Sequence, residues 1–537
     1  MPQSPEYPVR AGAREKLADR LRRDLGRDVY PASVVCLESC VIALVRGPEH
    51  KRLLVLPLGP RTPFDELIPG RSGTQTGHFE LPLSAAVARI VRSELPWTAP
   101  SPQPLARSIG LGDRLGLATP GHVRAVRGSG FIPYFAQQSV REMTRTKRTP
   151  QDVIDAATWG VLETGWREGY GSDADHLKTT ADIDACLEAG FTMFTIDPGE
   201  YVQPLTAVCE PSGRSGSRDA SPAAPGADRD PTDRDPGTRA RSSLDEALAN
   251  LPWSALETTW ADLRGRYLGR GLALDGGIEL CFSEETLARA AIQYAHAIAH
   301  VLTMYRHLCA RASRFELEVS IDETPVPTTV AEHYFVAAEL KRLGVRWVGL
   351  APRFPGGFEK AVDYRGDLTE FERSFAGHVA VARCLGPYRI SIHSGSDKFA
   401  IYPIAGRLAG ELLHVKTAGT SWLEALRVIA RCDPGLFRDI LQVAVARFES
   451  DRASYAVSAR TEDLPAPAEL SNDRLPELMD HPSARQVLHV TFGSVLTSTE
   501  GTPSLPQRIG RLLRTVEEHH YTALAAHLGR HLAGLRG

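Results

Sequence analysis

From about residue 105 onward the chain repeats one pattern, in which a short apolar stretch is followed by a polar or glycine-rich turn and then an amphipathic helix. Eight such units predict an α/β fold, a (β/α)₈ TIM-type barrel. The third strand is the least regular, because Gly171 and Asp173 interrupt it. The strands are expected at residues 107–111, 131–137, 170–177, 191–197, 315–322, 346–351, 389–394 and 412–417.

Helices are expected between most of these strands, and several begin with the capping-box pattern of a small polar residue followed three positions later by glutamate. Long helices are predicted for residues 283–310 and 421–450. The three capping boxes are Asp367-x-x-Glu370, Thr329-x-x-Glu332 and Ser421-x-x-Glu424.

Two regions flank the barrel, which we expect to span residues 106–450. Residues 1–105 predict an N-terminal α+β extension, in which the apolar runs 33–45 and 53–58 pair as strands. Residues 451–537 predict a mostly helical C-terminal extension that ends in a helix over 507–535. Residues 210–245 contain almost no large apolar side chain and predict a disordered insertion after the fourth strand.

The composition excludes several classes of partner. The net charge of −3 gives no support for nucleic acid or an anionic membrane as partner. No apolar run approaches the ~20 residues of a membrane span, and the N-terminus lacks a signal-peptide pattern. The eight cysteines include no Cys-x-x-Cys pair, so we expect buried free thiols (Cys186, Cys281, Cys309, Cys384) in a cytoplasmic protein. The oligomeric state is left open, a homo-oligomer being one expectation.

Two predicted strand ends each deliver a histidine followed by a lysine. His393 precedes Lys398, and His414 precedes Lys416. The ends of barrel strands converge on one point, where barrel enzymes hold their active sites. Two histidines with a carboxylate suit Zn, Mn, Fe, Co or Ni, although core histidines bonded to backbone would give the same pattern. The two lysines favour an anionic, carboxylate-bearing substrate.

A third strand end carries Asp175 and His176. An imidazole can bind a metal while the neighbouring carboxylate moves protons on the substrate. The alternative interpretation is that Asp175 caps the following helix and His176 is incidental.

The fifth predicted strand alternates polar and apolar residues with a period of two, so that Glu316, Glu318, Ser320 and Asp322 share one face. That face points into the barrel, where a carboxylate needs a metal or a cation as partner. We expect Glu318 to act as an acid, in competition with Asp322 and Glu323 nearer the mouth.

The loop after the sixth strand supplies two more candidates, Glu359 as a metal ligand and Arg353 as an anion-binding residue. A solvated pair of Glu359 with Lys360 is the alternative. The stretch Gly110-x-Gly112-Asp113-Arg114 is neither a Walker A motif nor a dinucleotide fingerprint.

Taken together, these residues resemble the tagaturonate epimerases of hexuronate catabolism, which interconvert D-tagaturonate and D-fructuronate. The resemblance covers most of residues 105–500. It implies a TIM barrel, a divalent metal and no organic cofactor, with Asp175 as proton acceptor, Glu318 as acid, and His176 and His393 as ligands. It leaves open whether Glu359 or His414 completes the metal site. The matching stretches are residues 110–122, 136–145, 174–178, 191–197, 320–324, 350–354, 393–398 and 414–420.

The two sugar acids implied by the resemblance differ at a carbon β to the ketone, whose C–H bond the ketone does not acidify. A retro-aldol/aldol route assisted by a metal is therefore our hypothesis. A class II metal-dependent aldolase acting on a ketose or keto-sugar acid is the alternative, since it would use the same residues. A sugar-binding or regulatory barrel without activity is a third hypothesis.

Overall fold

The structure is a computed structural model that describes residues 11–47, 49–68, 77–203, 244–465, 470–499 and 501–537. Its centre is a closed barrel of eight parallel strands in the order β11-β12-β13-β14-β5-β6-β7-β8. All eight predicted strands are present. They are β5 (Ser108–Gly110), β6 (Ile132–Ser139), β7 (Gly171–Leu177), β8 (Met193–Ile196), β11 (Glu316–Ile321), β12 (Gly349–Pro352), β13 (Arg389–Ile392) and β14 (Leu413–Lys416).

The structure explains why Gly171 and Asp173 interrupt the third predicted strand. A Cβ atom on Gly171 would lie 2.3 Å from the ring of Tyr134, so only glycine fits there. Asp173 is fully buried and pairs with Lys416 at 2.8 Å. The pairing of β7 with β8 also shifts register between Ala174 and Leu177. Within this bulge His176 adopts a φ of 57°, which is uncommon outside glycine.

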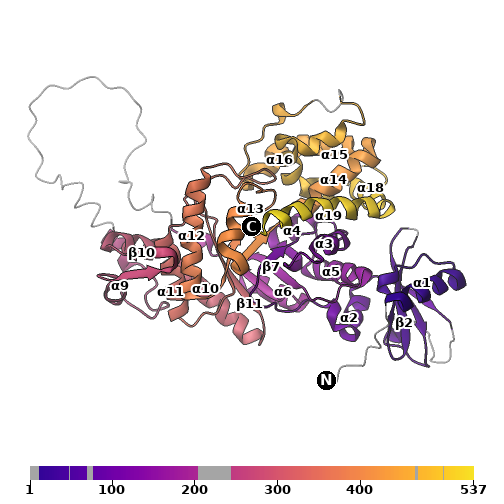
Figure 1. Cartoon of the computed structure of the whole chain (residues 1–537), viewed down its shortest axis with the longest axis horizontal. Coiled ribbons are helices and arrows are strands. Elements are labelled where there is room, and N and C mark those ends of the chain that lie inside the picture. Colours follow the sequence, from indigo (N-terminus) through magenta and orange to yellow (C-terminus); the bar gives the residue numbers. More distant parts are fainter. Residues whose placement is uncertain (1–10, 48, 69–76, 204–243, 466–469, 500) are drawn as a thin grey trace, which may run out of the picture.

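Helices surround the barrel, as Figure 1 shows. Thr329 forms the predicted capping box of α11 with Glu332, and Asp367 caps α12 through its own carboxylate. The predicted box at Ser421 is wrong, because α14 has already begun at Thr420. The helices that follow the strands are α3 (Thr119–Val126), α4 (Val140–Thr146), α5 (Pro150–Thr164), α6 (Thr180–Ala189), α11 (Val330–Arg342), α12 (Leu368–Leu385), α13 (Tyr402–Ala409) and α14 (Thr420–Cys432).

The connection from β8 to β11 is the longest in the barrel. It contains α9 (Trp260–Tyr267), the antiparallel pair β9 (Gly271–Leu274) and β10 (Ile278–Cys281), and α10 (Glu284–Arg311). Helix α10 confirms the long helix predicted for 283–310. Except for its last two residues, the predicted insertion 210–245 lies outside the described residues.

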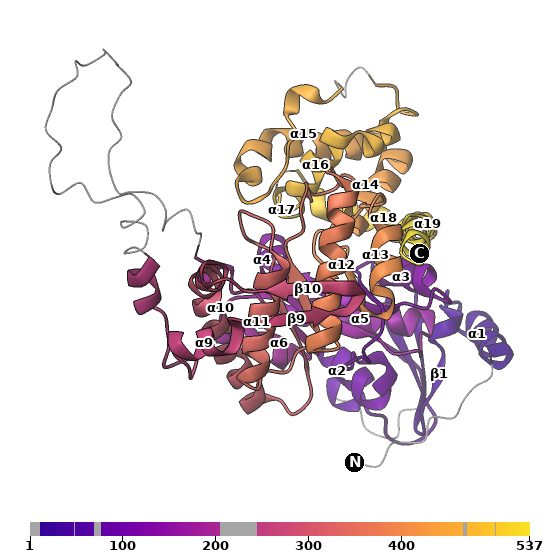
Figure 2. The ribbon, with the colours of Figure 1, turned by 60° about the vertical axis from the view of Figure 1, so that its left-hand side comes forward.

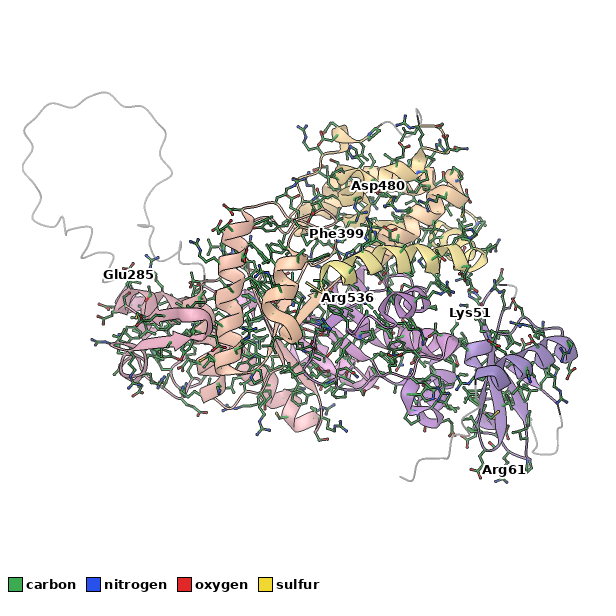
Figure 3. All side chains as sticks on the ribbon, in the orientation of Figure 1. Lys51, Arg61, Glu285, Phe399, Asp480 and Arg536 are labelled. Atoms are coloured by element: carbon green, nitrogen blue, oxygen red, sulfur yellow. The ribbon has the colours of Figure 1, made fainter. Side chains whose placement is uncertain are left out.

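The N-terminal extension packs beside the barrel. It contains α1 (Ala11–Leu25), the antiparallel strands β1 (Val35–Cys36), β2 (Cys40–Val45), β3 (Arg52–Pro57) and β4 (Phe79–Pro82), and α2 (Ala85–Glu94). β2 pairs with β3, which confirms the predicted pairing of the two apolar runs. Lys51, labelled in Figure 3, joins the extension to the rest of the protein through Glu163 at 2.5 Å and the hydroxyl of Tyr521 at 2.9 Å.

The C-terminal helices lie over the barrel in both Figure 1 and Figure 2. They are α15 (Pro434–Asp451), α16 (Pro482–Val490), α17 (Phe492–Leu496), α18 (Leu505–Thr515) and α19 (Glu517–Gly534). The single helix predicted for 421–450 is wrong: Asp433 and Pro434 divide it into α14 and α15. The predicted helix 507–535 is likewise two helices, which meet at Val516. Apolar residues of α14 and α15 share one core with those of α16 to α18, so the proposed division at residue 451 separates helices that pack together.

The described part of the chain also tests the expectations about the cysteines and about membrane-spanning helices. Cys186 is a buried free thiol as expected, whereas Cys281, Cys309 and Cys384 are free but exposed, because their helix and strand ends face solvent. No described helix has both the length and the apolar character that crossing a bilayer requires.

Candidate functional site

A cavity of about 450 Å³ opens at the carboxyl ends of the barrel strands. Its floor contains Asp175 and His176 at the end of β7, His393 just after β13, and Lys416 at the end of β14. Tyr455 and His489 line it from the C-terminal region. The site thus lies at the carboxyl ends of the strands, as is usual for this architecture, and the C-terminal extension contributes to its wall.

Three of the predicted site residues come together in this cavity. Donor atoms of Asp175, His176 and His393 all lie within 4.8 Å of one another, and the two imidazole centroids are 5.0 Å apart. Strict alternation along β7 would send Asp175 and His176 to opposite faces, but the positive φ of His176 turns both toward the cavity. The helix-cap interpretation of Asp175 is wrong, because Thr179 caps α6.

The two histidines each keep a ring nitrogen that is buried and without a hydrogen bond. Nδ1 of His176 and Nδ1 of His393 have no such partner, although carboxylate oxygens lie 2.9 Å and 3.3 Å away, on Asp175 and Asp322. Buried polar atoms normally have partners. Two imidazole nitrogens with carboxylate oxygens close by make a donor set that suits a divalent transition metal.

His393 is held from its other side by Glu318, whose Oε1 lies 2.8 Å from Nε2. A carboxylate behind a metal-binding histidine fixes the orientation of the ring and leaves its second nitrogen free. Burial alone would lower the pKa of His393, but Asp322 outweighs it and raises that pKa to about 10. The imidazole thus lies in surroundings that strongly favour positive charge.

Lys416 lies at the centre of the acidic groups. Its Nζ is 2.7 Å from Asp175, 2.7 Å from Glu318 and 2.8 Å from Asp173. Burial raises the pKa of Asp173 to about 6, against the effect of Lys416. Burial would also raise the pKa of Asp175, but His176 and Lys416 hold it well below its usual range. Three carboxylates thus surround one ammonium group, and Asp322 adds a fourth carboxylate to the site beside His393. More carboxylates than ammonium groups at one place suit a bound cation.

A second group of possible ligands shares His176. Its other members are Asp197, which is buried, and Glu323, which is exposed. Nε2 of His176 lies 3.7 Å from Glu323. His176 therefore has carboxylates near both of its ring nitrogens.

The structure does not bring His414 to this group. Strand register sets Ser391, not His393, beside His414, so His414 lies one layer deeper in the barrel. There Nδ1 of His414 is 2.7 Å from the hydroxyl of Ser108, and its ring packs against Tyr134. The prediction of matched positions on the two strands is therefore wrong.

Two other predicted residues, Glu359 and Lys398, are occupied by hydrogen bonds within the protein. Glu359 lines the same cavity, but its carboxylate accepts hydrogen bonds from Ser458 and Gln486, both at 2.7 Å, and it does not belong to the group of possible ligands formed by Asp175, His176 and His393. Lys398 is fully buried and donates to the carbonyl oxygens of Glu359, Val362 and Ser396. It lies outside the cavity wall and has no free donor for a substrate.

The remaining predicted anion-binding residue, Arg353, does line the cavity. Its guanidinium group also donates to the carbonyl oxygen of Thr324. It is therefore in a position to contact a ligand.

Known proteins match this chain over nearly its whole length. A family model for tagaturonate epimerase matches residues 30–214 and 239–535. The chain belongs to the tagaturonate epimerase family. The tagaturonate/fructuronate epimerase of Thermotoga maritima is 41% identical over 448 residues, which are 83% of this chain and 84% of that protein.

Solved structures agree with this membership. The fructuronate-tagaturonate epimerase of Cohnella laeviribosi, complexed with one glycerol, matches with a TM-score of 0.84 and 35% identity. Its native form matches with a TM-score of 0.83 and 34% identity. Each comparison covers 97% of this chain and 99% of the other. As a member of this family, the protein is an isomerase.

Sequence reasoning on this family member missed several cavity residues. The sequence predicts Lys360 only as the partner of Glu359 and Arg141 only within the matching stretch 136–145, and it assigns no role to Tyr455 or His489, although all four line the cavity. Asp173, which interrupts its strand in the sequence pattern, is also part of the site through its ion pair with Lys416. Its spacing of two from Asp175 was the available signal, because residues i and i+2 of a strand share a face.

Proposed function

We propose that this protein interconverts D-tagaturonate and D-fructuronate, a step of hexuronate catabolism in the cytoplasm, and that it requires a divalent cation. The observation that carries the proposal is the meeting of Asp175, His176 and His393 at the barrel mouth, with two imidazole nitrogens that lack hydrogen bonds. The names of the relatives from Thermotoga maritima and Cohnella laeviribosi support the choice of substrate.

A retro-aldol/aldol route fits these substrates, because the carbon that changes configuration lies β to the ketone. A cation held by His176 and His393, with Asp175 or Asp322 as carboxylate ligand, would polarise the ketone oxygen and stabilise negative charge there. This donor set suits Zn, Mn, Fe, Co or Ni.

In this route Asp175 takes the proton of the β-hydroxyl group. The bond between the carbons α and β to the ketone breaks. The electrons of the O–H bond form the carbonyl of an aldehyde fragment, while those of the broken C–C bond pass to the ketone-bearing fragment. The aldehyde turns over, the C–C bond forms on its other face, and Asp175 returns the proton. Lys416, 2.7 Å from Asp175, fixes that carboxylate and keeps it ionised.

For Glu318 the contacts support a different role from that of a direct acid. Its carboxylate is 1% exposed, is absent from the cavity wall, and contacts both His393 and Lys416. We propose that it positions His393.

The first expected result is EDTA-sensitive conversion. Metal-reconstituted protein incubated with D-tagaturonate should produce D-fructuronate, followed by NMR or chromatography, and EDTA should stop the reaction until metal is restored. Protein that holds metal but leaves D-tagaturonate unchanged would contradict the proposed substrate. A free aldehyde, trapped by a coupled dehydrogenase, would instead favour the aldolase.

The Glu318→Gln variant tests the positioning role. Removing the carboxylate behind His393 should weaken metal binding about 10–100-fold, measured by metal titration of the apoprotein. Glu411→Gln, at an exposed glutamate, is the control and should bind metal as the wild type does. Unchanged metal affinity in Glu318→Gln with a loss of rate would favour the acid role instead.

A further inference from the structure

Lys360 is a cation of the cavity that has no anionic partner among the described residues. Lys360, in the loop between β12 and α12, is partly buried and lines the cavity. Its Nζ contacts the hydroxyl of Ser394 at 2.5 Å, and within the described ranges it forms no ion pair. A partly buried ammonium group that meets only a neutral hydroxyl is poorly compensated for its lost hydration.

A second cation faces the same cavity. Arg141, in α4, lines the wall, and its guanidinium group lies 5.0 Å from the ring centroid of Tyr455. It too has no ion pair among the residues the structure describes. Lys416 and Lys398 differ from these two, since three carboxylates engage the first and three carbonyl oxygens the second.

The backbone on both sides of Lys360 is held in place. The carbonyl oxygens of Glu359 and Val362 both accept from Lys398, and that of Ala361 accepts from Arg485 at 2.8 Å. Ala361 adopts a φ of 63°, a conformation that persists only where the surroundings impose it. The loop is therefore fixed before any ligand arrives, as a precise binding group requires.

Lys360 also lies at a suitable place relative to the histidines. Its partner Ser394 directly follows His393 in the chain. The unpaired cations and the acidic floor thus lie in one cavity of about 450 Å³. A small molecule with an anionic end and a polar, uncharged end could contact both at once.

We propose that Lys360, with Arg141 beside it, binds the carboxylate of the substrate and selects sugar acids over neutral ketoses. This inference rests on the proposed function, because it assigns one end of the proposed substrate to one wall of the cavity. Lys398 is then a positioning residue: it holds the loop that presents Lys360.

The test is direct binding of two unreactive probes that differ only in the charged end. D-mannonate carries a carboxylate where D-mannitol carries a hydroxymethyl group, and calorimetric titration of the metal-loaded protein gives Kd for each. Lys360→Met should raise Kd for D-mannonate about 30-fold and leave Kd for D-mannitol unchanged. Arg141→Met should raise Kd for D-mannonate by a smaller factor, and Lys360→Arg should restore most of the affinity.

Lys16→Met, on the exposed side of α1, is the control and should match the wild type with both probes. Metal content and thermal unfolding of each variant show whether it is folded. Equal weakening of D-mannonate and D-mannitol, or no change for either, would overturn the assignment of Lys360. If D-mannonate binding depends on Lys360 while the wild type fails to convert D-tagaturonate, the carboxylate site stands and the proposed reaction is wrong.

Discussion

The His393→Ala variant is expected to lose nearly all epimerase activity, about 10³-fold or more in kcat/KM, while its barrel stays folded. The loss follows because the alanine removes a proposed metal ligand, and charge stabilisation by a metal contributes several kcal/mol to such reactions. His393 lies just after β13 rather than within it, so the strand pairing is unaffected. Metal content by elemental analysis, kcat/KM and thermal unfolding of the same preparation measure the three effects.

The matched control is His414→Asn, one layer below. Both histidines are buried, but Nδ1 of His414 contacts Ser108 and His414 lies outside the group of possible ligands. We expect this variant to retain its metal, although the altered core lowers its stability. If His414→Asn loses metal as His393→Ala does, the depth that the structure assigns to His414 is wrong.

The strands of the barrel were predictable because they depend on local pattern. Short apolar runs, polar turns and the alternation of Glu316, Glu318, Ser320 and Asp322 are all visible in the sequence, and all four of these side chains are buried or directed toward the site. Strand ends converge in any barrel, so the approach of Asp175 and His393 was predictable from the fold. The approach of His176 also needs its positive φ, which the sequence does not indicate.

The depth of each residue was not predictable, because it depends on strand register. Counting along β13 and β14 places His393 and His414 at similar strand ends, whereas the pairing of Ser391 with His414 sets them a layer apart. Register in a barrel is fixed by packing around the whole sheet, which one strand does not reveal.

The position of Lys398, in a loop, was likewise not predictable from the local sequence. Ser394 and Asp397 both have positive φ values, and these two left-handed residues turn the chain so that Lys398 points away from the cavity. Asp397 is held by Arg485 at 2.7 Å and by His527 at 2.6 Å. Phe399, labelled in Figure 3, packs edge-on against His531 of α19, with ring centroids 4.9 Å apart. These partners come from more than 80 residues away, so no local pattern indicates them.

Replacing Lys416 with methionine is expected to cause the largest loss of stability at the site. The change leaves Asp173, Asp175 and Glu318 buried together without their ammonium group, and removing one partner of a buried ion pair costs about 3–5 kcal/mol. Denaturant unfolding of the metal-free protein measures this loss as a lower midpoint at an unchanged slope. Epimerase activity should be lost as well, because Asp175 is no longer held in place.

Lys360→Met is the matched comparison, since it removes a second lysine from the same cavity. Lys360 has no carboxylate partner among the described residues, so its loss should cost much less than that of Lys416. Adding Asp173→Asn to Lys416→Met should recover part of the stability, because the two residues are in contact and their effects are not additive. Equal destabilisation by Lys416→Met and Lys360→Met would mean that the carboxylates are not what Lys416 stabilises. The contrast tests the different surroundings of the two lysines: Lys416 contacts three buried carboxylates, whereas Lys360, the proposed carboxylate-binding residue, contacts the hydroxyl of Ser394.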